Sequence, residues 1–277
     1  MHKTINALYF SPTNTTKKIV SGIAKKISDT INDKITVNTI AVNTIDFTLP
    51  GVRIKAMSFS VQDVVIIGVP VYAGRVPNVL LKYLNSITGN GALAIPVVVY
   101  GNRNYDDALI ELKDILEFNG FKVIAAGAFI GEHSFSMTLA KNRPDEKDMV
   151  IVSDFAKQIY TKITTQEEIQ TVVVKGNQPY RKHYMPINKD GRPVDLRKVV
   201  PKTNSNCIDC KLCVNACPMG SIDAEDVSKI NGICIKCGAC IKKCPVQAKY
   251  YDDENYLRHK QELEIEYTAR KEPELFL

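Results

Sequence analysis

The sequence predicts an α/β protein with a parallel sheet, followed by a second, smaller domain. From residue 1 to about 165, short apolar runs alternate with segments of helical period, as in a parallel sheet that is covered on both faces. All eight cysteines lie in a separate stretch between Cys207 and Pro245. A chain of 277 residues is long enough for one ordinary domain and a smaller one.

The cysteines have a spacing that suits iron–sulfur clusters. Each of two runs reads C-x2-C-x2-C-x3-C-P, and the second repeats the first 27 positions later. A thiolate at every third residue of a tight loop can reach three corners of a four-iron cube, and the fourth cysteine of each run ligates the other cluster. We therefore expect two [4Fe–4S] clusters. The ligand sets are Cys207, Cys210, Cys213 and Cys244 for one, and Cys234, Cys237, Cys240 and Cys217 for the other.

Two other uses of cysteine fit this pattern less well. Zinc ribbons carry two C-x2-C pairs rather than two runs of four that end in C-P. Disulfide frameworks have irregular spacing and occur in secreted chains. The stretch resembles the bacterial two-cluster ferredoxins over about 40 of the 277 residues.

The composition is that of a soluble globular protein, with 45% hydrophobic and 24% charged residues. The longest apolar runs are interrupted by Gly or Pro and are too short to span a bilayer. The N-terminus lacks the apolar region of a signal peptide, and clusters need reduced thiolates, so we expect a cytoplasmic protein. The net charge of +6 comes without a nucleic-acid-binding motif.

The first predicted unit is a strand, a polar loop and a helix. Ile5 to Phe10 is the apolar run, S-P-T-N-T-T-K is the loop, and apolar residues from Ile19 to Ile27 follow a helical period. Free N–H groups at the start of such a helix, with the loop hydroxyls, can bind phosphate oxygens. The chain has neither a P-loop lysine nor G-x-G-x-x-G here, which argues against ATP and nicotinamide dinucleotides.

The same alternation continues along the chain. Further strands are expected near residues 35–40, 64–69, 95–100 and 122–130, and further helices near 77–86, 106–119 and 145–164. Residues 43–60 are ambiguous. Ligands of such sheets lie beyond the carboxyl ends of the strands. There, loops 70–77, 100–107 and 131–136 combine small residues with aromatic, amide or charged ones, as a planar heteroaromatic ligand requires.

With these loops and S-P-T-N-T-T, residues 1–165 resemble a flavodoxin domain, which implies a five-stranded parallel sheet and bound FMN. The resemblance places the FMN phosphate on Ser11, Thr13, Asn14, Thr15 and Thr16. It places the isoalloxazine ring between Tyr72, Ala73, Gly74, Gly101, Asn102 and Tyr105. Asn14 stands where the family usually has glycine, and asparagine tolerates a positive φ better than most residues. An α/β domain that has lost its cofactor is the alternative.

Charged residues in the same loops have two interpretations. Arg75 and Arg103 lie where flavodoxins are often acidic, and a guanidinium beside the flavin would raise its reduction potential. Alternatively, both point to solvent or pair with Asp106 and Asp107. His133, with Glu132, either relays protons to the flavin or a substrate or forms only local hydrogen bonds.

The remaining segments complete the predicted organisation. Residues 166–203 form an extended connector, 204–250 the two-cluster domain, and 251–277 a charged helix and a tail whose last three residues anchor on another surface. The segment from Lys175 to Lys202 contains eight Lys and Arg residues but only two acidic ones. This basic stretch either docks an acidic partner or is a solvated linker.

In its full order the chain resembles the flavodoxin–ferredoxin fusion proteins of anaerobes. The resemblance implies single-electron transfer between two [4Fe–4S] clusters and FMN, from a reduced ferredoxin-like donor to a partner redox protein. The alternative is an FMN-dependent reductase of a small-molecule acceptor fed by the clusters, and a redox sensor is a third possibility. The oligomeric state is open, with a homodimer possible.

Overall fold

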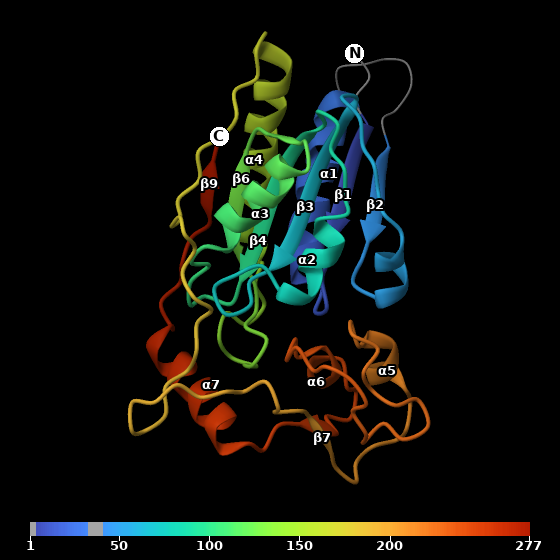
Figure 1. The fold of residues 1–277 in the computed structure, drawn as a ribbon, viewed down its shortest axis with the longest axis vertical. Coiled ribbons are helices and arrows are strands. Elements are labelled where there is room, and N and C mark those ends of the chain that lie inside the picture. The colour runs from blue at the N-terminus through green and yellow to red at the C-terminus, as the bar shows by residue number, and fades with distance from the viewer. Residues whose placement is uncertain (1–3, 33–40) are drawn as a thin grey trace.

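The computed structural model describes residues 4–32 and 41–277. Within these ranges the chain forms a large sheet flanked by helices, with a small cysteine-rich module below one end of the sheet (Figure 1). No helix in the described ranges has the length and apolar character needed to cross a bilayer.

The parallel sheet has the strand order of the flavodoxin-like fold. Its strands are β1 (Thr4–Tyr9), β2 (Val42–Asp46), β3 (Asp63–Pro70), β4 (Leu93–Tyr100), β5 (Lys122–Val123) and β6 (Ala126–Ile130). The order β2-β1-β3-β4-β6 corresponds to the 2-1-3-4-5 order of flavodoxins. The predicted fold class is therefore confirmed. The strand expected at residues 35–40 lies outside the described residues.

Helices on both faces explain why the strands read as continuous apolar runs. All eight residues of β4 are buried. On one face, α1 (Thr15–Asn32) and α4 (Glu146–Thr165) share a core with the strands, and on the other face α2 (Asn78–Leu84) and α3 (Ala108–Phe118) do so. The predicted apolar stripe of α1, from Ile19 to Ile27, is fully buried.

The end of the chain adds an antiparallel edge strand that the sequence did not predict. After α7 (Glu254–Glu266), strand β9 (Glu274–Phe276) pairs with β6, with Ala126 opposite Phe276. Leu275 and Phe276 pack on opposite cores of the sheet. The expected anchoring of the tail thus takes the form of β-pairing, which covers the exposed edge of β6.

The connector runs alongside the sheet instead of hanging free. Residues 167–201, all within the described part of the chain, form no helix or strand. Val172 donates a backbone hydrogen bond to the Val123 carbonyl (3.0 Å), and Val172 and Val174 are buried in the core beneath α3. Tyr180 donates its hydroxyl proton to Asp114 at 2.6 Å. The connector is therefore a strap on the α3 side.

The cysteine-rich module lies at the carboxyl ends of the parallel strands (Figure 1). Its two ends are tied by the antiparallel strands β7 (Lys202–Thr203) and β8 (Lys249–Tyr250), and it holds two short helices, α5 (Leu212–Ala216) and α6 (Ala239–Lys242). Its small hydrophobic cluster is centred on Ile222, Val227 and Cys240.

Candidate redox site

The loop between β1 and α1 has the geometry of an anion site. Ser11 is buried, its hydroxyl oxygen accepts a hydrogen bond from Lys17 N–H (2.9 Å), and its own N–H donates to Thr48 Oγ1 (2.8 Å). Asn14 adopts a positive φ of 68°, a backbone conformation that glycine reaches most easily, and glycine is the usual residue at this position in flavodoxins. The Lys17 N–H is used by Ser11 and the Lys18 N–H by the Asn14 carbonyl, which leaves the N–H groups of Thr15 and Thr16 at the start of α1 for phosphate oxygens.

The other expected phosphate residues differ in exposure. Thr13 and Thr15 are half-buried and Asn14 is exposed, whereas Thr16 is buried against β3. A Cβ on Gly131 would lie 2.9 Å from Thr15 Cβ, so the loop after β6 closes on the same site. Among the described residues, the loop thus has backbone N–H groups without partners at Thr15 and Thr16, and it packs tightly against Gly131.

Two loops beyond the sheet, residues 70–77 and 100–107, are called the ring loops here. In the first, Tyr72 and Arg75 exchange backbone hydrogen bonds of 3.0 and 3.1 Å, and Ala73 and Gly74 between them have positive φ angles of 51° and 77°. A side chain at Gly74 would overlap the Asp106 carboxylate of the second loop. The ring loops are therefore in direct contact.

Both arginines of the ring loops are paired within the protein. Arg75 donates two hydrogen bonds of 2.7 Å to the buried Glu111, which raise the pKa of the arginine. Arg103 pairs with Asp106 and stacks at 4.3 Å over the ring of Tyr184. One of the alternatives from the sequence was that both arginines pair with Asp106 and Asp107. Arg103 does pair with Asp106, whereas Arg75 pairs with Glu111 on α3.

Asn102 joins the second ring loop to the C-terminal tail. Its side-chain NH2 donates to the carbonyls of Tyr267 (2.6 Å) and Ala269 (2.9 Å). Its Oδ1 is the one buried side-chain nitrogen or oxygen in the described ranges without a hydrogen-bond partner. Tyr105 also contacts the tail, donating to Glu274 at 2.9 Å. An unpaired buried acceptor in this loop fits a ligand that brings a donor.

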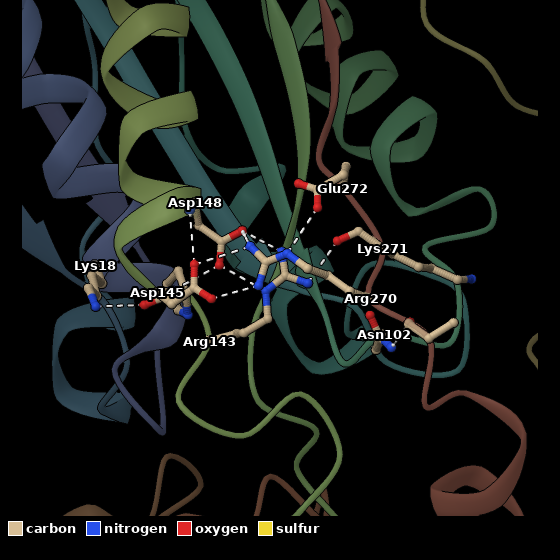
Figure 2. A network of polar contacts seen from close by, with 10 residues as sticks. Lys18, Asn102, Arg143, Asp145, Asp148, Arg270, Lys271 and Glu272 are labelled. Atoms are coloured by element: carbon tan, nitrogen blue, oxygen red, sulfur yellow. Dashed lines mark hydrogen bonds and ion pairs between the residues drawn. The ribbon is translucent and has the colours of Figure 1, made fainter.

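A charged network holds the tail against the start of α4 (Figure 2). Arg143 pairs with the buried Asp148 and donates to the Lys271 carbonyl at 2.7 Å. Arg270 binds Asp145 at 2.6 Å, and this hydrogen bond lowers the pKa of Asp145. The charges of the tail were visible in the sequence, but nothing there identified their partners.

Glu132 and His133 differ in the reach of their contacts. Glu132 accepts from the N–H of Asn142 (2.9 Å) and from Lys242 of the cysteine-rich module (3.0 Å). His133 Nδ1 accepts from Phe135 N–H (3.1 Å), and burial, with smaller effects of nearby cations, lowers its pKa to about 3. The imidazole is neutral at pH 7 and its hydrogen bond to Phe135 is local, whereas Glu132 also binds across to the cysteine-rich module.

Two cavities in the module gather the cysteines in crossed sets. The inner cavity is lined by Cys217, Cys234, Cys237 and Cys240, and the outer cavity by Cys207, Cys210, Cys213 and Cys244. None of the eight is in a disulfide. In the described ranges no three His, Cys, Asp or Glu side chains converge on a single-ion position. A four-iron cube does not require such convergence, because each cysteine binds a different iron.

The inner cavity lies against the loop after β6. A Cβ at Gly238 would overlap the carbonyl oxygen of Ser134. Burial, and then the charges of Cys237 and Cys234, raise the pKa of Tyr72, so its phenol is neutral. Arg53 donates to the carbonyl of Pro218 at 2.6 Å. Sequence reasoning missed Arg53, since no motif surrounds it.

The comparisons agree with this division of the chain. The family model of the 4Fe-4S dicluster domain matches residues 206–248. No curated protein matches the sequence. The chain therefore carries a [4Fe–4S] dicluster domain after a flavodoxin-like domain, which supports a redox role in electron transfer.

Solved structures are similar to the N-terminal part. An archaeal flavodoxin is 15% identical with a TM-score of 0.40, covering 58% of this chain and 98% of its own. The Streptococcus pneumoniae TIGR4 flavodoxin is 17% identical with a TM-score of 0.38, covering 57% of this chain and 99% of its own. An apo NADH:FMN oxidoreductase, EMOB, is 14% identical with a TM-score of 0.41, covering 61% and 94%. Because these TM-scores are low, we assign the flavodoxin-like fold from the strand order and not from the similarity to these structures.

Proposed function

We propose that this chain is an electron-transfer protein that passes single electrons between two [4Fe–4S] clusters and FMN. The donor is a reduced ferredoxin-like protein and the acceptor a partner redox protein. The observation that carries the proposal is the contact of the inner cavity with the flavodoxin-like domain, where Gly238 lies against Ser134 and Arg53 donates to the carbonyl of Pro218 at 2.6 Å. When bound, the clusters supply one-electron transfer and the flavin supplies one- and two-electron transfer.

The residues at each site fit the groups assigned to them. The crossed cysteine sets line separate cavities, as two clusters require. The N–H groups at the start of α1 suit a phosphate, and Asn102 Oδ1 can accept a hydrogen bond from a bound ring. The proposed cluster ligands are the four cysteines of the inner cavity and the four of the outer cavity. The proposed FMN ligands are Ser11, Thr13, Asn14, Thr15 and Thr16 for the phosphate, and Tyr72, Ala73, Gly74, Arg75, Gly101, Asn102, Arg103, Tyr105 and Asp106 around the ring.

The two cavities have different roles in this proposal. Cys210 is exposed, and Ile208 and Leu212 beside it are 63% and 47% exposed, so the outer cavity offers partners an apolar surface near a cluster. The inner cavity is covered by the flavodoxin-like domain. Because both domains are in one chain, the effective concentration of one redox site at the other is high.

The surroundings of the ring loops favour a carrier over a reductase. Tyr184 of the connector donates its N–H to the Ala73 carbonyl (2.8 Å) and lies over Arg103, and the tail binds Asn102. With the cysteine-rich module on a third side, these segments restrict the approach of a small acceptor. Clusters also require reduced thiolates, so we place the protein in the cytoplasm.

The first test is cofactor content. Anaerobically purified protein should contain about eight irons, from two four-iron clusters, and one FMN per chain. Iron and flavin analysis checks this. Zinc in place of iron, or two irons per chain, would contradict the cluster assignment, and failure to bind FMN after reconstitution would contradict the flavin assignment.

The second test separates a carrier from a reductase. Stopped-flow reoxidation of the reduced protein is measured with protein and small-molecule acceptors over a series of salt concentrations. For a carrier whose basic connector docks an acidic partner, raising salt to physiological strength should slow transfer, because charges are then screened beyond roughly 8 Å. Saturable, salt-independent turnover of a small acceptor would instead establish the reductase.

A further inference from the structure

The side-chain amide of Asn102 has a fixed orientation and an unused acceptor. Asn102 is 3% exposed and has a φ of 65°. Its NH2 group faces two carbonyl oxygens of the tail, those of Tyr267 and Ala269. Turning the amide over would place Oδ1 against both carbonyls, where no donor exists, so the assigned orientation is the favourable one.

Donors near Asn102 are already committed elsewhere. The Arg103 guanidinium binds Asp106, the Tyr105 hydroxyl donates to Glu274, and Lys271 Nζ donates to the Arg103 carbonyl. Oδ1 has no partner within the described ranges. A buried acceptor left in this state destabilises the fold, and a donor supplied by a ligand would relieve that cost.

The tail is thus built into the second ring loop. It contacts three of the loop's residues, binding the Asn102 amide, the Arg103 carbonyl and the Tyr105 hydroxyl. The tail is itself held in place by Arg270, which binds Asp145 on the opposite side of the network (Figure 2). The orientation of Asn102 therefore depends on a segment more than 160 positions away, since the bond to Tyr267 spans 165 residues.

We infer that the tail is part of the flavin site, where it orients Asn102 so that Oδ1 accepts a hydrogen bond from the isoalloxazine N3–H. This inference rests on the FMN binding proposed above. N3–H is the only N–H donor of the oxidised ring, and a few such placed polar groups fix a ligand's orientation in a pocket. Asn102 acts directly on the ring, and Arg270 acts as a positioning residue through the tail.

The test compares FMN with its N3-methylated derivative, which lacks the donor. Full-length protein with clusters in place and flavin removed is titrated with each ligand, and binding is followed by flavin fluorescence. Wild-type protein should bind FMN about 5- to 100-fold more tightly than the N3-methyl form, the range expected for one buried hydrogen bond. Asn102→Leu should bind FMN more weakly by a similar factor and should no longer distinguish the two ligands.

Two further variants test the role of the tail. Arg270→Ala, which releases the tail from Asp145, should reduce the preference for FMN over the N3-methyl form. Lys175→Ala removes only an exposed pair with Glu274 at 3.1 Å and should leave the preference unchanged. Asn104→Leu alters an exposed amide of the same loop and controls for a general loss of loop stability.

The outcomes separate this inference from the proposed function. If wild-type protein binds no FMN, the proposed function fails and the inference falls with it. If wild-type protein binds FMN but Asn102→Leu keeps the preference, the inference alone is overturned. Should Asn102→Leu not fold, Arg270→Ala decides, and an unchanged preference in that variant overturns the role of the tail.

Discussion

Lys211 and Gly238 occupy equivalent positions in the two cysteine runs, and each precedes a short helix with a left-handed backbone, at φ of 58° and 73°. The Lys211 side chain binds Asp209 at 2.8 Å beside the outer cavity. At Gly238 a side chain would overlap the Ser134 carbonyl of the flavodoxin-like domain. The same ligand loop thus accepts a lysine where it faces solvent and requires glycine where another domain packs against it.

Burial separates the two cavities in the same way. In the inner cavity, burial raises the pKa of the Cys237 thiol to about 12, and Cys240 is buried. In the outer cavity, Cys210 is exposed, and although burial opposes it, backbone N–H groups that include Ala248 lower the pKa of Cys244. The two runs of one motif therefore differ in exposure, with the most buried cysteine in the inner cavity and the most exposed one in the outer cavity.

The crossed assignment predicts the largest effect. Cys217→Ser should eliminate the cluster of the inner cavity, although Cys217 belongs to the first run, and Cys244→Ser should eliminate the outer one. Electron paramagnetic resonance of the two reduced variants identifies the remaining cluster in each. Loss of the cluster of the mutated residue's own run would contradict the crossing.

The next largest effect is expected from a side chain at Gly238, where the module contacts Ser134. Gly238→Ala and Gly220→Ala both place alanine at a positive φ, which costs roughly 1–2 kcal/mol. Only Gly238→Ala also meets a backbone oxygen, whereas the nearest atom to the new methyl of Gly220→Ala is Pro50 Cγ at 3.6 Å. We expect Gly238→Ala to lower the free energy of unfolding by at least about 1 kcal/mol more than the control, as overpacking does. Equal losses in denaturant titrations would show that the contact tolerates a side chain.

Tyr72 provides a test of the inner contact from the other side. Tyr72→Ala removes a half-buried ring that is near enough to Cys234 and Cys237 for their charges to raise its pKa, and it should weaken docking of the module by about 1 kcal/mol. Electron exchange between the inner cluster and FMN should slow accordingly in flash-reduction measurements. Tyr72→Phe keeps the ring and serves as the control, and a large loss in that variant would assign the effect to the hydroxyl.

The smallest expected effect concerns the Glu132–Lys242 pair, whose contribution to stability should depend on pH. Burial alone would raise the pKa of Glu132, but the Asn142 N–H and Lys242 lower it. The stabilisation is therefore complete above the ordinary glutamate range and is lost as pH falls through the lowered value. Glu132→Gln should cost about 0.5 kcal/mol at pH 7 in thermal unfolding, and less in acid.

A matched pair beside the outer cavity controls for general charge effects. Asp209→Asn removes the exposed bond to Lys211, which links nothing to the flavodoxin-like domain, and its effect should be smaller than that of Glu132→Gln. If Glu132→Gln were as costly at pH 4 as at pH 7, the pair would not be the source of the pH dependence.

The sequence by itself determined the features that depend on local spacing. The apolar stripe of α1, the buried runs of β3 and β4 and the C-x2-C-x2-C-x3-C-P runs all follow from residues a few positions apart. Their geometry is set by the period of a helix, the sides of a strand or the reach of a loop. The alternation of strands and helices and the two crossed cysteine sets were predictable for this reason, whereas the strand order was not predicted.

Tertiary structure decided which distant groups meet. Arg53 reaches the Pro218 carbonyl across 165 positions, Arg75 binds Glu111 instead of Asp106 or Asp107, and β9 covers the edge of β6. A charged side chain or a short E-L-F segment has many equivalent partners in a sequence, and only the packed chain selects one. The environments of the two cavities, and the acceptor left on Asn102, were decided at that level because they depend on which surfaces exclude water.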